Sequence, residues 1–135
     1  MLVEQFFLLA VARAALAYLP KFVAMLPSDV RLRKSLEIAQ TLKAGKRYPA
    51  KFLVFHIAPG LTSRTRFAFA VGKNVGNSVV RHKVIRRLRH LVMDNYTKFP
   101  ASSDVVVRAL PGIDQASHLE LQTSFESALT KVGSQ

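Results

Sequence analysis

The stretch VGKNVGNSVVRHKVIRRLRH, residues 71–90, combines a turn, a helix start and a dense run of positive charge. Asn77 and Ser78 are residue types that commonly cap helices. From there to residue 96 the apolar side chains recur every three or four positions: Val80, Val84, Leu88, Leu91 and Val92. This spacing predicts an amphipathic helix over 78–96 that buries one face.

The remaining surface of the predicted helix is strongly basic, with five Lys or Arg within residues 81–89. Guanidinium groups offer a planar fork that matches phosphate oxygens, whereas lysine acts as a point charge. A solvated charged face is the usual alternative for a charge run. Because acidic residues are nearly absent here, we predict an RNA-binding face made of Arg81, His82, Lys83, Arg86, Arg87 and Arg89.

The loop before this helix, residues 72–77, contains two glycines and Lys73. Glycines let backbone amides approach a phosphate at a helix N-terminus, and lysine adds charge. A plain turn with a solvated lysine is an equally weighted alternative on this evidence alone. We place Lys73 and Asn77 in the predicted RNA-binding set.

Composition defines the class of partner. The 135 residues include 20 Lys and Arg, 8 Asp and Glu, no Cys, and 50% hydrophobic residues, for a formal charge of +12. The absence of cysteine excludes a disulfide scaffold and a thiolate metal site, and the hydrophobic content favours a compact domain. Residues 31–98 hold 16 basic and two acidic side chains, so a polyanion is expected to bind there.

The pattern outside the central stretch is that of an α+β domain over residues 25–135. We predict a short helix from Ser35 to Gly45, strands over 47–58, 65–71 and 104–110, and a helix over 115–132. The core side of the last helix is predicted to be Leu119, Leu121, Phe125, Ala128 and Leu129.

Residues 1–24 form an apolar extension that differs from the rest of the chain. Arg13 and Pro20 interrupt it before about 20 apolar residues accumulate, so a membrane span is not expected. A helix lying on a surface or packed on a partner fits better, and a membrane-surface protein is a minor alternative. A natural start at Met25 is a further interpretation, and we expect no stable membrane association.

The sequence shows no catalytic or metal-binding constellation. A metal-dependent nuclease needs clustered carboxylates, but the basic region contains only Glu37 and Asp94. The histidines at 56, 82, 90 and 118 lack metal-ligand spacing. We therefore interpret each as a solvent-facing or RNA-contacting imidazole.

With these features in place, residues 71–90 resemble the protein subunit of bacterial ribonuclease P, in particular its actinobacterial members. Three segments agree in the same order: MLPSDVRLRK at 25–34, FLVFH at 52–56 and DVVVRALP at 104–111. The resemblance covers residues 25–132. A non-catalytic ribosomal or structured-RNA binding protein is the alternative that the basic helix alone would also allow.

The resemblance implies an α/β sandwich, with a central mostly antiparallel sheet packed by helices and a left-handed βαβ crossover. It also implies a cytoplasmic ribonucleoprotein that removes the 5′ leader of precursor tRNA. The RNA subunit with Mg²⁺ performs that catalysis, and the protein binds no cofactor of its own. The implied partners are the ribonuclease P catalytic RNA and precursor tRNA.

Site residues follow from the same resemblance. The family's Arg-Asn-Arg helix motif falls on residues 81–83, where His82 and Lys83 depart from it, and Ile85 stands where relatives often place a basic residue. The opening segment adds three RNA-binding residues, Arg31, Arg33 and Lys34. The implied leader site contains Ile38, Leu42, Phe55 and Arg66, with Phe55 as its aromatic platform. The alternative for Phe55 is a place in the core.

Overall fold

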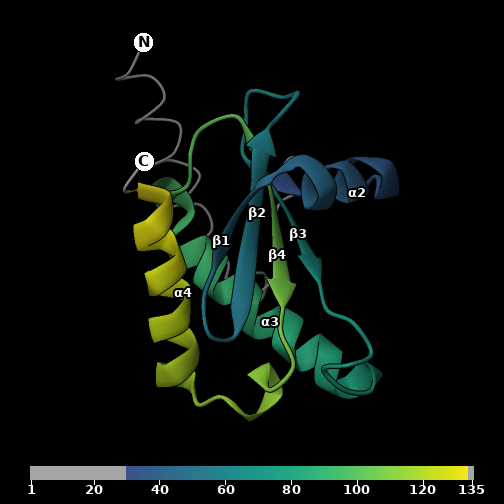
Figure 1. The fold of residues 1–135 in the computed structure, drawn as a ribbon, viewed down its shortest axis with the longest axis vertical. Coiled ribbons are helices and arrows are strands. Elements are labelled where there is room, and N and C mark those ends of the chain that lie inside the picture. Colours follow the sequence, from purple (N-terminus) through teal and green to yellow (C-terminus); the bar gives the residue numbers. More distant parts are fainter. Residues whose placement is uncertain (1–29, 134–135) are drawn as a thin grey trace, which may run out of the picture.

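A mixed sheet with helices on both faces makes up the part of the chain that the structure describes, residues 30–133 (Figure 1). This computed structural model places the 1–24 extension outside the described residues. The strands are β1 (Lys46–Pro49), β2 (Leu53–Pro59), β3 (Arg66–Ala70) and β4 (Ser103–Ala109). The helices are α2 (Ser35–Ala44), α3 (Ser78–Asp94) and α4 (His118–Gly133), with short 3-10 turns at η3 (Tyr96–Lys98) and η4 (Ile113–Gln115).

The strand order is β1-β2-β4-β3. β2 pairs antiparallel with β1 and β4, whereas β3 pairs parallel with β4. In Figure 1 the arrows of β3 and β4 both point down, and β4 lies to the left of β3. The chain leaves β3, passes behind the sheet as α3 and returns to β4. This connection is a left-handed βαβ crossover, a rare arrangement that the resemblance implied.

The large core lies on the α3 and α4 side of the sheet. Alternate residues of each strand point there, because side chains along a strand alternate between faces. Phe55 of β2 is fully buried, and its ring centroid lies 5.3 Å from that of Phe99 and 5.0 Å from that of Phe125 in α4. Phe67 of β3 extends the cluster, 4.9 Å from Phe99.

A smaller core lies on the opposite face, where α2 covers the sheet. Its buried residues are Leu32, Ala68 and Val106, and Ile38 and Leu42 of α2 pack against them. The small side chain of Ala68 leaves room for these helix residues. The side chains of β3 therefore alternate between the two cores, with Phe67 in the large core and Ala68 in the small one.

The central helix matches its prediction closely. The Asn77 side chain accepts a hydrogen bond from the Val80 backbone N–H at 3.0 Å and caps α3. Val84, Leu88, Leu91 and Val92 are buried, and the half-buried Val80 packs against the same core. The helix ends at Asp94, two residues before the predicted boundary.

Two predicted elements were wrong in detail. The segment predicted as one strand over 47–58 is a hairpin of β1 and β2. The chain turns between Ala50 and Leu53, where the Ala50 N–H donates to the Leu53 carbonyl at 2.8 Å. The last helix begins at His118 rather than 115, after a capping box in which Ser117 and Glu120 exchange side-chain-to-backbone hydrogen bonds. Leu119 lies in its first turn and is 72% exposed, so its assignment to the core was also wrong.

Candidate nucleic-acid interface

The solvent face of α3 presents the densest basic cluster of the described residues. His82, Lys83 and Arg86 are exposed, whereas Val84 and Leu88 of the same helix are buried. The helix is therefore fixed by its apolar stripe, and its cations are held on a rigid support. Such a surface suits a phosphate backbone.

Two arginines of the predicted set are partly taken up by the fold. Arg87 donates from Nη2 to the Ala116 carbonyl at 2.8 Å, which ties α3 to the segment before α4. Arg81 is half-buried, and its Nε is buried with no hydrogen-bond partner among the described residues. Arg87 is thus less available to RNA than its sequence position indicated.

The loop at the start of α3 presents Lys73 to solvent and packs Gly76 against the helix. Lys73 is exposed, and Gly76 lies so close to Val80 that an added Cβ would approach its Cγ1 to 2.7 Å. The exposed Asn77 has its side-chain oxygen engaged in the helix cap. Lys73 and Asn77 are therefore both at the surface, and their contact with RNA stays a prediction.

The basic segment before α2 lies along the free edge of β3. Leu32 donates its backbone N–H to the Phe67 carbonyl at 2.8 Å, and Arg31 forms a parallel bridge with Phe67. Arg33 and Lys34 are exposed, and Lys34 Nζ lies 4.0 Å from a Glu37 oxygen. This pairing brings a segment distant in sequence next to β3.

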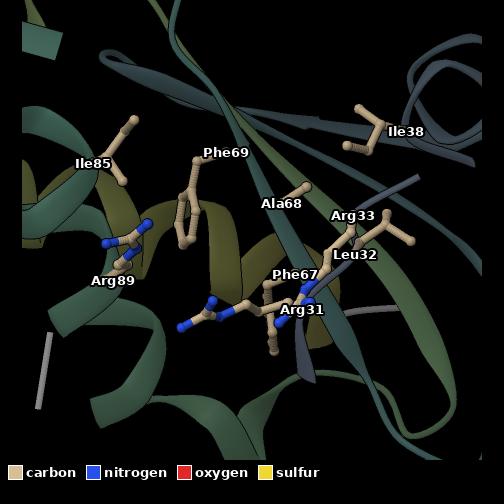
Figure 2. Close-up of a pocket in the computed structure, with 9 residues that line it drawn as sticks. All are labelled: Arg31, Leu32, Arg33, Ile38, Phe67, Ala68, Phe69, Ile85 and Arg89. Carbon is tan, nitrogen blue, oxygen red and sulfur yellow. The ribbon is translucent and has the colours of Figure 1, made fainter. Parts of the chain in front are cut away.

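A pocket of about 210 Å³ opens at this edge, between α2 and α3 (Figure 2). Three arginines line it, Arg31 and Arg33 from the N-terminal segment and Arg89 from α3. The apolar part of its wall includes Phe69 of β3 and Ile85 of α3. The pocket therefore combines an apolar wall with cationic side chains from two elements.

Arg89 is held in an unfavourable position for a cation. Burial, and then the nearby charge of Arg31, lowers the pKa of Arg89. Arginine keeps its proton in proteins, so the lowered pKa reflects mainly the cost of burying this guanidinium and, second, the repulsion by Arg31. A bound anion would relieve that cost.

Arg66 does not serve as a free cation. Its Nε and Nη2 each donate to Asp104 at 3.0 Å, and Nη2 also donates to Glu37 of α2. Hydrogen bonding to Asp104 raises the pKa of Arg66. The guanidinium joins α2 to β3 and β4, and its contact with the leader stays a prediction.

Phe55 lies in the core and cannot serve as the leader platform. Its side chain faces α3 and α4, on the opposite side of the sheet from Ile38 and Leu42. It is 0% exposed and stacks edge-on against Phe125. The alternative place in the core is the one that the structure supports, whereas Ile38, Leu42 and Arg66 of the predicted leader set lie on the α2 side of the sheet.

His56 was expected at the surface but is buried beneath α2, with 4% of its area exposed. Neither ring nitrogen has a hydrogen bond of good geometry among the described residues. Burial, and then the charges of Arg108 and Arg47, lowers the pKa of His56 from its usual 6.5, while the nearby Leu42 backbone opposes this weakly.

This burial predicts a stability that falls on acidification. Below about pH 6.5 the unfolded chain protonates His56 while the folded protein resists protonation, so the free energy of unfolding decreases as pH falls toward the folded pKa. Urea unfolding at pH 7.5, 6.5 and 5.5 should show this slope, and His56→Gln should flatten it. The same change at the exposed His118 should leave the slope intact. If the pH dependence of the free energy of unfolding were unaltered in His56→Gln, buried His56 would not be its source.

Sequence reasoning missed residues that the strands bring to the α2 side. Arg108 shares that face with Asp104 and Val106, and its Nε is buried without a partner among the described residues. The alternation in DVVVRAL carried this signal, since residues 104, 106 and 108 must share one face of a strand. Phe69, within the strand predicted over 65–71, was also not predicted as a site residue.

No group of three or more His, Asp or Glu side chains within residues 30–133 is arranged to hold a metal ion. In the same range, no helix is long and apolar enough to cross a membrane.

Comparison with known proteins gives a consistent match. The ribonuclease P family matches residues 26–133. The ribonuclease P protein component of Streptomyces bikiniensis is 41% identical over 117 residues, covering 80% of this chain and 95% of the relative. The component from Corynebacterium diphtheriae is 42% identical over 115 residues, covering 80% and 97%.

Solved structures show the same fold. The RNase P protein of Staphylococcus aureus matches with a TM-score of 0.69 at 22% identity, covering 76% of this chain and 94% of that one. The RNase P protein from Thermotoga maritima matches with a TM-score of 0.67 at 19% identity, covering 76% and 96%.

Proposed function

Because this chain belongs to the ribonuclease P protein family, we propose that it binds a catalytic RNA and the 5′ leader of precursor tRNA. In this role it promotes the endonucleolytic cut that produces the mature 5′ end of tRNA. The actinobacterial relatives agree with the resemblance seen in residues 71–90. The protein is the subunit of a ribonucleoprotein endoribonuclease whose RNA carries out the catalysis.

The observation that carries this proposal is the basic face that α3 exposes to solvent while its apolar face is buried in the core. Lys83 and Arg86 are free to reach phosphates without disturbing the core. The RNA-binding surface extends to Lys73 at the start of the helix and to Arg31 and Arg33 beside β3. A surface of this composition recognises backbone geometry and charge more than base sequence.

We keep Ile38 and Leu42 of α2 as proposed leader contacts, through the part of each side chain that the small core leaves exposed. Both are half-buried and lie on the side of the sheet opposite α3 and α4. Neither offers a ring for base stacking, so leader contacts there would be apolar. Phe55 is not part of this surface, because it lies in the core on the other side of the sheet.

We assign the required Mg²⁺ to the RNA subunit. Within residues 30–133, Glu37 and Asp104 share the guanidinium of Arg66, from which both accept hydrogen bonds. The donor set therefore does not suit a protein-held divalent ion. We also place the protein in the cytoplasm, where precursor tRNA is processed in bacteria.

Binding to the catalytic RNA should depend steeply on salt. If about five to eight phosphates are neutralised, log K against log[salt] should have a slope of roughly −4 to −7. Arg86→Ala should reduce the slope by about one unit and weaken binding by about 1–3 kcal/mol. Fluorescence titrations with labelled RNA from 50 to about 400 mM KCl would measure both effects.

Lys131→Ala is the matched control, because Lys131 is an exposed cation near the end of α4, far from the start of α3 in Figure 1. It should leave the slope nearly unchanged. A slope near zero for the native protein would mean that the basic face serves solubility only.

A further inference from the structure

We propose that the pocket at the β3 edge holds the base of one unpaired nucleotide of the catalytic RNA, stacked on Phe69, with its phosphate beside Arg31 and Arg89. The inference rests on the proposed function, because it names what one part of the RNA-binding surface recognises. It would give this surface a contact that depends on base stacking as well as on charge.

The geometry suits a single ring system. Figure 2 shows the Phe69 side chain standing between Ile85 and Ala68, with the Arg89 side chain beside it. Phe69 is only half-buried, so part of its ring is available to a ligand. A volume of about 210 Å³ is below the roughly 300–1,000 Å³ of drug-sized ligand sites and favours one base over two.

The charge of the pocket favours a nucleotide over an uncharged ligand. Within residues 30–133, Arg31, Arg33 and Arg89 line the pocket, and none of the lining residues is acidic. Arg89 has no hydrogen bond or ion pair among the described residues to neutralise it, and its neighbour Arg31 repels it. A phosphate between these two guanidinium groups would replace repulsion with charge-assisted hydrogen bonds.

The position of the pocket selects the catalytic RNA as the source of this nucleotide. Ile85 and Arg89 lie on the same helix as Lys83 and Arg86, which we assign to the RNA subunit. Unpaired nucleotides with accessible faces are the parts of structured RNA that proteins stack upon. The leader is instead assigned to Ile38 and Leu42, of which only Ile38 reaches the pocket wall.

The chain contains an internal reporter of occupancy. Of its four isoleucines, Ile38 and Ile85 line the pocket, while Ile57 and Ile113 do not. With ¹³C-labelled isoleucine methyl groups in the full chain, adenosine 5′-monophosphate should shift the Ile38 and Ile85 signals saturably and leave Ile57 and Ile113 in place. Inorganic phosphate should produce no ring-current shift at either pocket residue.

Phe69→Leu tests the stack while keeping an apolar side chain. It should weaken binding to the catalytic RNA by about 5- to 150-fold, as expected for one lost base–aromatic stack. Phe52→Leu is the matched control, since Phe52 is also half-buried against the large core but lies outside the pocket. It should change affinity less than two-fold. Melting temperatures would verify that both variants fold.

Four results would overturn the proposal. Equal shifts with phosphate and with the nucleotide would reveal a simple anion site, and an absence of shifts would show that no base enters. Unchanged RNA affinity in Phe69→Leu would remove the stack. A loss confined to precursor tRNA would assign the pocket to the leader. Native stimulation of tRNA processing alongside any of these results would leave the proposed function standing.

Discussion

Phe55→Ala is expected to lower the free energy of unfolding by about 3–5 kcal/mol, the usual range for deleting a fully buried phenyl ring. The Phe55 ring lies between Phe99 and Phe125, so its removal leaves a cavity where β2, α4 and the segment after α3 meet. Urea unfolding monitored by circular dichroism would measure the loss. Variant protein that remains folded should bind precursor and mature tRNA complexes with the same preference as the native chain.

Phe52→Ala provides the control for this experiment. Phe52 precedes β2 and is half-buried, so its loss should cost clearly less stability than that of Phe55. A small stability loss in Phe55→Ala, together with selective weakening of precursor binding, would return Phe55 to the leader site and contradict its place in the core.

Arg66→Leu is expected to destabilise the fold by about 3–5 kcal/mol, as found when one partner of a buried ion pair is removed. The side chains of Arg66, Glu37 and Asp104 are 14%, 15% and 8% exposed, so the two carboxylates would lose their partner in a poorly solvated site. The loss should loosen α2 from the sheet. Chemical denaturation would measure the stability, and hydrogen exchange would detect the loosened helix.

Adding Asp104→Asn to Arg66→Leu should recover part of the lost stability, because it removes one of the two unpaired charges. Lys34→Leu is the control, since Lys34 is 82% exposed and 4.0 Å from Glu37, and it should change stability by less than about 1 kcal/mol. An Arg66→Leu variant as stable as the native protein would show that the triad does not anchor α2.

The sequence allowed the central helix to be predicted because its signals are local. Asn77 caps the first turn, and the buried stripe from Val84 to Val92 recurs at helical spacing. The strand over 104–110 was found for the same reason, as a short apolar run between turn residues. The family resemblance added the strand topology and the crossover, which local patterns do not encode.

The features that were missed depend on tertiary contacts. Helices cover both faces of β2, so Val54, Phe55 and His56 are all buried. Polar and apolar residues therefore do not alternate along this strand, and the sequence does not show which face Phe55 occupies. The ion triad joins residues 37, 66 and 104, which are far apart in the sequence. The hairpin turn near Ala50 contains no glycine or asparagine, and so the two strands appeared as one.

The central claim is that this protein assists an RNA enzyme and contributes RNA contacts instead of catalytic groups. Its most direct test is cleavage of precursor tRNA by a bacterial ribonuclease P RNA at low Mg²⁺, with and without the full chain. We predict little cleavage by the RNA alone, none by the RNA-free protein, and strong stimulation when both are present. Cleavage by nuclease-free protein without RNA, or no stimulation of the RNA, would contradict the account.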